Sequence, residues 1–243
     1  MWQGRLARNI RPFFEAQDVD ILCLQELNNS FVPIADWLET FQSLKVVKEA
    51  TGLTDEYYSP TLSYDIMDVE VAFGNGILSR YALSDQQTIF TNGSYAKITK
   101  ASDQISNTRN AQIVTIQTPE GKVTIVNTHA HWDKNPMGSE LSVERLEILA
   151  NALKDVEGPI IVAGDFNVSS ESQAIQSFKK TLGLTDLTSE HGITNTLNNL
   201  VTPFKVACDH IFINEAIEVT DFRVDETLLS DHKILVLEFN INK

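Results

Sequence analysis

The sequence lacks long apolar runs, has only two cysteines and carries little positive charge. No apolar run approaches the roughly 20 residues that a membrane-spanning helix needs, and the first residues lack the apolar core of an export signal. Cys23 and Cys208 both lie in apolar segments, which favours buried, reduced thiols over a disulfide or a metal pair. We therefore expect no stable membrane insertion and a cytoplasmic location.

Basic residues are scarce: 19 Lys and Arg stand against 33 Asp and Glu, which gives a net charge of −14. Proteins that adhere broadly to nucleic acid rely on Lys and Arg to neutralise phosphates, so this balance argues against that class. It does not exclude an active site that handles phosphate, because a bound cation inverts the local electrostatics.

The 243 residues are 42% hydrophobic, which is enough for a sizeable core. No repeat, low-complexity tract or linker rich in Pro, Gly and Ser divides the chain, and predicted strands and helices alternate. We expect one mixed α/β domain over residues 1–243, and a monomer.

Hydrophobic periodicity predicts the individual elements. Helices are expected at 2–16, 31–43, 139–155 and 171–182. Strands are expected at 20–26, 44–49, 159–163, 209–213, 217–224 (beside 209–213) and 234–239. Hairpins are expected at 85–90 with 94–99, around Asn92-Gly93, and at 111–118 with 122–128. Residues 50–75 show no clean period and predict a long surface loop, and Gly74–Arg80 predicts a turn that leads into a strand.

The chain is organised around the segment Gly158–Asn167, a buried strand followed by Gly164-Asp165-Phe166-Asn167. Asp165 and Asn167 are two residues apart, so in an extended chain they point to the same side. A carboxylate beside an amide carbonyl offers the hard oxygen ligands that Mg²⁺, Mn²⁺ or Ca²⁺ takes. The alternative is a turn that merely uses Asp and Asn.

Other polar residues also lie at the ends of predicted strands. Glu26 and His129 with His131 come at the end of a strand, Asp209 opens one, and the run Ser230-Asp231-His232 precedes one. A carboxylate at a strand end needs solvent, a partner or a metal, because burying it alone is costly. Two histidines two apart could coordinate a metal or face a phosphate. Each fragment alone also fits a loop or a turn, and Arg145 in the predicted helix 139–155 fits an exposed helix arginine.

Six short motifs, taken together, resemble the endonuclease/exonuclease/phosphatase superfamily, which includes DNase I-like nucleases, abasic endonucleases, inositol polyphosphate phosphatases and neutral sphingomyelinases. They are Leu24-Gln25-Glu26, Gly74-Asn75-Gly76-Ile77-Leu78-Ser79-Arg80, Asn127-Thr128-His129, Gly164-Asp165-Phe166-Asn167, Cys208-Asp209-His210-Ile211-Phe212 and Ser230-Asp231-His232. Each is weak alone, but all occur in the family's order over nearly the whole chain.

The resemblance implies a four-layer α/β/β/α sandwich, in which helices flank two packed, mostly antiparallel sheets. It also implies a site. Glu26 is similar to the family's metal-binding glutamate, and Asp165 and Asn167 to the pair that contacts the scissile phosphate, the attacking water or a second metal. His232 resembles the essential histidine and Asp209 the acid that holds it. The resemblance further places Asp231 in the metal and phosphate cluster and His129 as the second active-site histidine. Its implied metal ligands are Glu26, Asp165, Asn167, Asp231 and His232.

Two features depart from the family pattern. The family usually begins with a strand that ends in an active-site Asn, whereas this sequence starts at the predicted first helix. We therefore expect that strand to be missing, which would leave a sheet edge exposed. His210 replaces the aromatic residue that often follows the Asp of its strand, and a local specificity role is one interpretation.

The resemblance implies a hydrolase that uses Mg²⁺, with Mn²⁺ or Ca²⁺ as alternatives. A nuclease-like phosphodiesterase is the first interpretation, because Asn127–Trp132 resembles a segment of deadenylase-like and bacterial members. The acidic charge favours a second one, a phospholipid, inositol phosphate or other small phosphoester as substrate. A catalytically impaired binding module with the same fold is the third.

Overall fold

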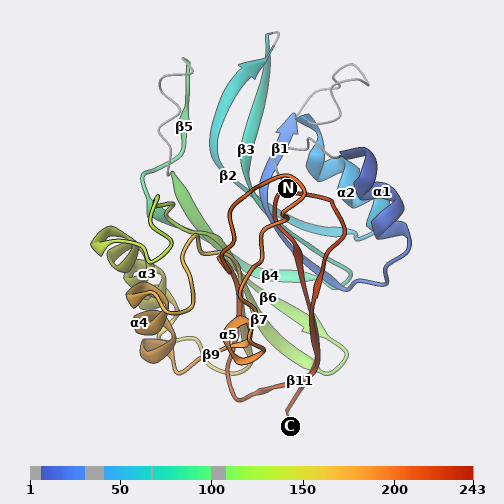
Figure 1. The fold of residues 1–243 in the computed structure, drawn as a ribbon. Coiled ribbons are helices and arrows are strands. Elements are labelled where there is room, and N and C mark those ends of the chain that lie inside the picture. The colour runs from blue at the N-terminus through green and yellow to red at the C-terminus, as the bar shows by residue number, and fades with distance from the viewer. Residues whose placement is uncertain (1–6, 31–40, 67, 100–107, 243) are drawn as a thin grey trace.

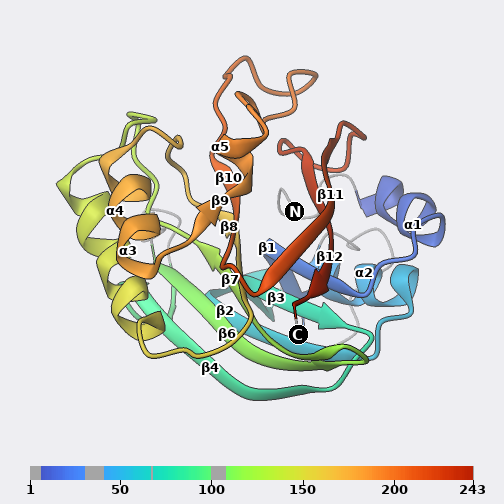
Figure 2. The ribbon, with the colours of Figure 1, turned by 90° about the horizontal axis from the view of Figure 1, so that it is seen from below.

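Two β-sheets pack face to face, and helices cover the outer face of each (Figures 1 and 2). The computed structural model describes residues 7–30, 41–66, 68–99 and 108–242. One sheet has the order β1 (Ile21–Ser30), β3 (Val69–Ser79), β2 (Asp55–Ile66), β5 (Ala96–Lys97). The other has the order β4 (Leu83–Asn92), β6 (Arg109–Thr118), β7 (Gly121–His129), β8 (Ile160–Asp165), β10 (Asp209–Ile213), β9 (Thr185–Asp186). β11 (Ile217–Asp225) and β12 (Ile234–Ile241) form a separate antiparallel pair.

The helices complete a four-layer sandwich, as the resemblance implied. α1 (Ala7–Glu15) and α2 (Ser43–Thr51) pack on the first sheet, and α3 (Glu140–Leu153) and α4 (Gln173–Leu182) on the second; α5 (Leu187–Glu190) follows β9 (Figure 2). Within the described residues the strand pairs are antiparallel except β7–β8 and β2–β5. The prediction of two mostly antiparallel sheets flanked by helices is therefore confirmed.

Three apolar cores hold these layers together. Leu149, Phe178 and Phe212 belong to the core between the second sheet and its helices. Ile77 and Ile161 belong to the core between the two sheets. Fully burying one such side chain stabilises the fold by about 1.5–3 kcal/mol. Packing between the layers therefore holds the strand ends in place.

Asn127 ties the two sheets together near the end of β7. Its Nδ2 lies 3.0 Å from the Leu24 carbonyl oxygen, 3.1 Å from that of Gly76 and 3.0 Å from Gln112 Oε1. Its Oδ1 accepts a hydrogen bond of 2.6 Å from Gln25 Nε2. Asn127 is fully buried, so these bonds satisfy a polar group that would otherwise destabilise the interior. The Asn-Thr-His motif thus fixes the register between the sheets directly beside His129.

Several predicted elements are confirmed. α1 covers the described part of the predicted helix 2–16. α3 matches the predicted helix 139–155, and α4 matches the predicted helix 171–182. β1, β8, β10 and β12 match four predicted strands, and β6 and β7 form the predicted hairpin. Most of the predicted helix 31–43 lies outside the described residues.

The predicted strand 44–49 is wrong, because this segment is helix α2. Its apolar run looked strand-like, but the buried positions Ser43, Val46, Val47 and Ala50 recur at three and four residues. Gly52 ends the helix at φ 70°, a left-handed conformation that glycine adopts without strain. The helical period is therefore the signal that decides this segment.

The predicted loop 50–75 is also wrong. β2 and the first part of β3 form a long antiparallel pair there. Every second residue of this part of β2 is buried, as in other strands, but the buried residues are Ser59, Thr61 and Ser63, which carry hydroxyl groups instead of apolar side chains. Thr61, for example, donates a hydrogen bond of 3.0 Å to the Phe73 carbonyl. Because hydrogen bonds replace apolar burial, no hydrophobic period marks the strand.

Three further local predictions are corrected. Gly74–Arg80 is not a turn before a strand, because Gly74–Ser79 lies within β3. A Cβ on Gly74 would lie 2.3 Å from the Ser59 carbonyl oxygen, so these glycines permit close strand contact. Asn92-Gly93 does turn, but the following β5 pairs with β2 instead of β4. β11 pairs with β12, not with β10. β5 pairs with a strand distant in the sequence, whereas β11 pairs with the strand that directly follows it.

β1 lies at the end of its sheet among the described strands. An apolar cavity of about 240 Å³ separates it from β12 and reaches Asp209 and His232. The absence of the family's first strand stays a prediction. No described helix is long and apolar enough to cross a bilayer.

Candidate active site

Strand register brings three predicted site residues side by side. β7 and β8 run parallel with His129 opposite Asp165, and β10 runs antiparallel to β8 with Asp209 opposite Asp165. Residues directly opposite each other on paired strands point to the same face of a sheet. One row across three neighbouring strands therefore presents an imidazole and two carboxylates.

His232 reaches the same row from the loop before β12. Its Nδ1 lies 2.8 Å and 3.1 Å from the two carboxylate oxygens of Asp209. The backbone holds this loop in place, since Lys233 N donates to the Thr196 carbonyl at 2.7 Å. Thr196 Oγ1 also donates to Asp209 Oδ2 at 2.5 Å, which fixes the carboxylate that orients the imidazole.

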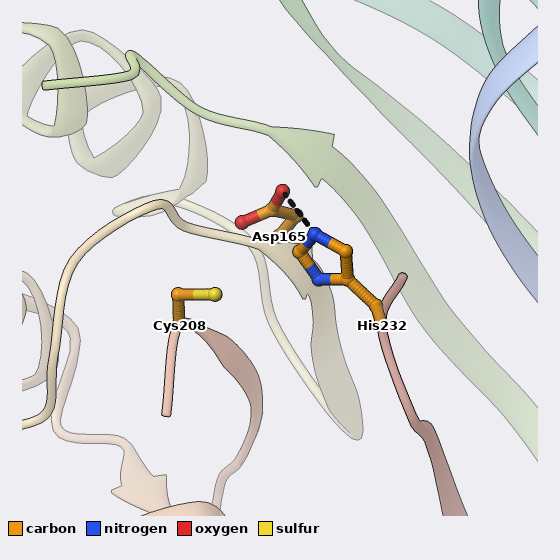
Figure 3. A group of neighbouring side chains, drawn as sticks. All are labelled: Asp165, Cys208 and His232. Carbon is orange, nitrogen blue, oxygen red and sulfur yellow. Dashed lines mark ion pairs between the residues drawn. The ribbon is translucent and has the colours of Figure 1, made fainter. Parts of the chain in front are cut away.

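Asp165 lies between the two imidazoles. Its Oδ2 is 3.6 Å from His129 Nε2 and 3.8 Å from His232 Nε2 (Figure 3 draws the second of these pairs). Its Oδ1 accepts a hydrogen bond of 2.8 Å from the Asn167 backbone N–H. Both imidazole separations exceed a direct hydrogen bond, so the oxygen and the two nitrogens face one small shared space.

Burial and mutual charge shift the pKa values of this group in different directions. Burial raises the pKa of Asp165 to about 7, and the Asp209 and Glu26 carboxylates add to the rise. Burial opposes the charged form of His232, but the Asp209 and Asp165 carboxylates outweigh it and hold the pKa of His232 well above its usual range. The pKa of His129 is well below its usual range, through burial and the Arg109 charge. At neutral pH the site therefore combines an imidazolium, a neutral imidazole and a carboxyl that titrates.

Glu26 sits at a β-bulge. The register between β1 and β3 shifts between Leu24 and Leu27, so two residues oppose one, and Glu26 has φ 57°. A bulge re-aims a side chain, and a left-handed glutamate is an uncommon, strained conformation. Glu26 is half-buried, and its charge acts on Asp165 and on Arg109. The strained backbone thus turns this carboxylate towards the same region.

Gly164 and Asn167 shape the turn that carries Asp165. A Cβ on Gly164 would lie 1.9 Å from the Thr128 carbonyl oxygen, and Gly164 has φ +148°, so only glycine fits beside β7. Asn167 has φ 59°, which asparagine tolerates better than most residues. Its Nδ2 donates to the Ala130 carbonyl at 3.0 Å, which leaves Oδ1 as the acceptor. The backbone conformation of this turn therefore helps to fix where the Asp165 and Asn167 side chains lie.

Asp231 precedes His232, and its carboxylate accepts a hydrogen bond of 2.9 Å from Ser230 Oγ. Its backbone oxygen accepts one of 2.7 Å from Asn198 N, which anchors the same loop. Asp231 is half-buried. The structure gives it a place beside His232 in sequence, and its metal-binding role stays a prediction.

His210 lies on the other face of β10 from Asp209 and is fully buried. Its Nδ1 is 3.1 Å from Asp186 Oδ2, and its Nε2 is 2.9 Å from the Val168 carbonyl oxygen. Its ring also packs on Phe166 and Phe212. These contacts give His210 a packing role in the core between the sheet and α4, and a specificity role stays an interpretation.

Sequence reasoning missed Arg109 and the thiol of Cys208. Arg109 Nε donates to the Ala130 carbonyl at 2.8 Å, and the arginine interacts electrostatically with Asp165 and Glu26. It opens β6, where an isolated arginine gives no motif. Cys208 directly precedes Asp209 and is buried, and its apolar surroundings in the sequence indicate only a core thiol. No local signal in the sequence marks either residue.

His131 and Arg145 lie beside Arg109. Both arginines lower the pKa of His131, after the larger effect of burial. His131 is 8% exposed. Within the described part of the chain, His131 Nδ1 and Arg145 Nε are buried without a hydrogen-bond partner. These two residues border the site, and none of their described contacts to its carboxylates assigns them a role.

The sequence matches the model of the Endonuclease/Exonuclease/phosphatase family over residues 3–232. The chain belongs to this family. A curated relative, a UPF0294 protein from Vibrio campbellii, is 28% identical over 120 residues, which cover 49% of this chain and 40% of that protein. The match therefore spans less than half the length of that protein.

Solved structures give the same fold. An endonuclease/exonuclease/phosphatase from Beutenbergia cavernae superposes with a TM-score of 0.71 at 19% identity, covering 99% of this chain and 66% of that one. The human Nocturnin catalytic domain with bound sulfate superposes with a TM-score of 0.68 at 21% identity, covering 100% and 88%. At these identities the likeness shows the family fold, and the individual substrates belong to those proteins.

Proposed function

We propose that this chain is a divalent-metal-dependent phosphodiesterase, within a family of phosphoester hydrolases. The observation that carries the proposal is the row of His129, Asp165 and Asp209 on neighbouring strands. His232 joins this row through its hydrogen bond to Asp209. The structurally similar Nocturnin catalytic domain holds a bound sulfate, an anion similar to phosphate in shape and charge.

The donor set fits a hard divalent cation. Burial raises the pKa of Asp165 to about 7, and the nearby Asp209 and Glu26 carboxylates add to this rise. Carboxylates in this arrangement are stabilised by a cation, and oxygen donors suit Mg²⁺, Mn²⁺ or Ca²⁺. We assign the cation to Glu26, with the oxygen atoms of Asp165, Asn167 and Asp231 as further candidate ligands. The resemblance also implied His232 as a ligand, but an imidazolium has no free lone pair for a cation, so this proposal gives His232 another role. When bound, the cation neutralises charge on the phosphate oxygens.

The protein's own groups take three roles. His232 is an imidazolium, held by Asp209, and we assign it to the phosphate oxygens, where its charge stabilises the transition state. Asp165 titrates near neutral pH and is the group best suited to accept a proton from the attacking water. Asn167 Oδ1, fixed by the bond to Ala130, helps to orient that water.

His129 completes the arrangement as a neutral imidazole. Its Nε2 faces Asp165 Oδ2 at 3.6 Å, and burial with the Arg109 charge keeps its pKa low. A neutral imidazole can donate a hydrogen bond to a phosphate oxygen or to the leaving oxygen. In this proposal His232 is the phosphate-contacting cation and Asp165 is the base.

A second candidate substrate class is a small or lipid phosphoester. The net charge of −14 favours it, because a polyanionic strand is repelled at long range by an acidic surface. The catalytic assignments are the same in both cases. Only the substrate outside the scissile phosphate differs.

A substrate panel tests the proposal. The purified chain is assayed on bis-p-nitrophenyl phosphate, single-stranded DNA, RNA and sphingomyelin, with Mg²⁺ or with EDTA. We expect hydrolysis of the diesters in Mg²⁺ and none in EDTA. Asp165→Ala and His232→Ala should abolish it, while His191→Ala, an exposed histidine outside the row, should retain it. Turnover of sphingomyelin alone would favour the second candidate, and no metal-dependent turnover at all would leave a binding module.

A further inference from the structure

The thiol of Cys208 is a buried potential ligand that the proposed reaction does not use. Figure 3 shows its side chain pointing towards Asp165 and His232. One ligand atom from each of these three residues lies within 4.8 Å of the other two. Cys208 is 5% exposed and Asp165 is 7% exposed, so the cluster lies at the inner wall of the site.

The chemistry of these three donors differs from that of the carboxylate set around Glu26. Mg²⁺ takes oxygen ligands and avoids sulfur, whereas thiolate, imidazole and carboxylate together suit Zn²⁺ and its soft analogue Cd²⁺. In tetrahedral Zn²⁺ sites, bonds of about 2.0–2.3 Å place the ligand atoms about 3.3–3.7 Å from one another. Asp165 Oδ2 and His232 Nε2 are already 3.8 Å apart.

Hydrogen bonds already hold two of the three ligands in the required orientation. His232 Nδ1 bonds Asp209, which leaves Nε2 as the ligand atom, and a carboxylate behind a metal-bound histidine is the common outer-shell arrangement. The Asn167 N–H occupies Asp165 Oδ1, which leaves Oδ2. The Cys208 backbone N–H bonds Thr196 Oγ1 at 3.1 Å, which fixes the start of β10.

We propose that Asp165, Cys208 and His232 form a second, thiophilic cation site that takes Zn²⁺ or Cd²⁺ and blocks catalysis. On binding, the thiol proton, the Nε2 proton of the His232 imidazolium and any proton held by Asp165 leave to solvent, and the ion forms bonds to Sγ, Oδ2 and Nε2, with water in the fourth position. The ion then occupies the two atoms assigned to phosphate contact and to proton transfer. Zinc is therefore an inhibitor of this chain and does not replace Mg²⁺. The cation site itself is independent of the proposed function, and only the inhibition rests on it.

Cadmium absorption tests the site without any substrate, because a cadmium–thiolate bond gives an ultraviolet charge-transfer band. Metal-free protein is titrated with Cd²⁺. We expect the band to saturate at one equivalent in the wild type and in Cys23→Ser, which keeps Cys208 and removes the chain's other thiol. It should be lost in Cys208→Ser and in Cys208→Ala. Asp165→Asn and His232→Gln should weaken Cd²⁺ binding at least about tenfold.

The variants are compared by thermal melting, and two replacements of Cys208 guard against one that fails to fold. The site is refuted if the wild type shows no band at saturating Cd²⁺, if the band survives without Cys208, or if it disappears in Cys23→Ser. It is also refuted if Asp165→Asn and His232→Gln bind Cd²⁺ as tightly as the wild type.

Inhibition is measured separately, in excess Mg²⁺. We expect Zn²⁺ to inhibit the wild type, and the inhibiting concentration to rise at least about tenfold in Cys208→Ser, relative to that variant's own uninhibited rate. An equal inhibiting concentration in both proteins would overturn the inhibitory role. If no substrate is hydrolysed at all, the proposed function fails, while the Cd²⁺ titration still decides whether the site exists.

Discussion

Asp165→Asn is expected to stabilise the metal-free protein at pH 8, although it removes the proposed catalytic base. The folded-state pKa of Asp165 is about 7, above its ordinary value of 3.8, through burial and the nearby carboxylates. The folded protein therefore holds a proton that the unfolded chain has lost, and the stability falls as pH rises from about 4 to about 7. Asparagine carries no charge and avoids this loss.

The magnitude follows from the size of the shift. A rise of about three pKa units corresponds to about 4 kcal/mol of lost stability once the carboxyl is ionised. For a chain of this size, that difference raises the melting temperature of the variant by roughly 8–16 °C. Below about pH 4 the carboxyl is protonated in both states, so the advantage of Asp165→Asn should disappear there.

Thermal unfolding followed by circular dichroism, with EDTA at pH 4 and at pH 8, checks this. Asp186→Asn is the matched control, because Asp186 is also buried but its pKa is lowered: burial opposes the charged form, and the hydrogen bond and charge of His210 outweigh it. It should lose about 1–3 kcal/mol at pH 8. An Asp165→Asn protein that melts at or below the wild-type temperature in EDTA at pH 8 would refute the reasoning. Added Mg²⁺ should stabilise the wild type more than this variant.

Three further predictions concern the neighbours of Asp165. Asp209→Asn should lower kcat about a hundredfold to ten-thousandfold on a diester with little change in KM, since the imidazole loses its charged partner; a change within threefold, measured by steady-state kinetics, would contradict it. Gly164→Ala should abolish soluble expression, because its Cβ would meet the Thr128 carbonyl oxygen. Gly158→Ala has open space around the new Cβ and should lower the free energy of unfolding by only about 1 kcal/mol. Two soluble variants with equal urea midpoints would contradict this. Asn127→Ala should lose about 3 kcal/mol in urea unfolding, because the inter-sheet acceptors lose their donor, and an unchanged midpoint would count against that clamp.

The sequence indicated the elements whose period is visible in apolar residues. Helices α3 and α4 and the β6–β7 hairpin follow from such patterns and from local turns. It failed at β2, where hydrogen-bonded Ser and Thr occupy the buried face, and at the partners of β5 and β11. Strand pairing is decided by how the strands pack in the folded chain, and the apolar pattern of one strand does not identify its partner.

What the sequence determined by itself was the set of chemical groups and their places at strand ends: Glu26, Asp165, Asn167, Asp209 and His232. Only the tertiary structure decided which atoms meet. The register of β7, β8 and β10 sets His129 and Asp209 against Asp165, and the loop contacts with Thr196 bring His232 to Asp209. Burial then set their charges, raising the pKa of one carboxyl to about 7 and lowering that of His129. A pKa depends on the dielectric and charges within a few ångströms, and those surroundings exist only once the distant strands have packed together.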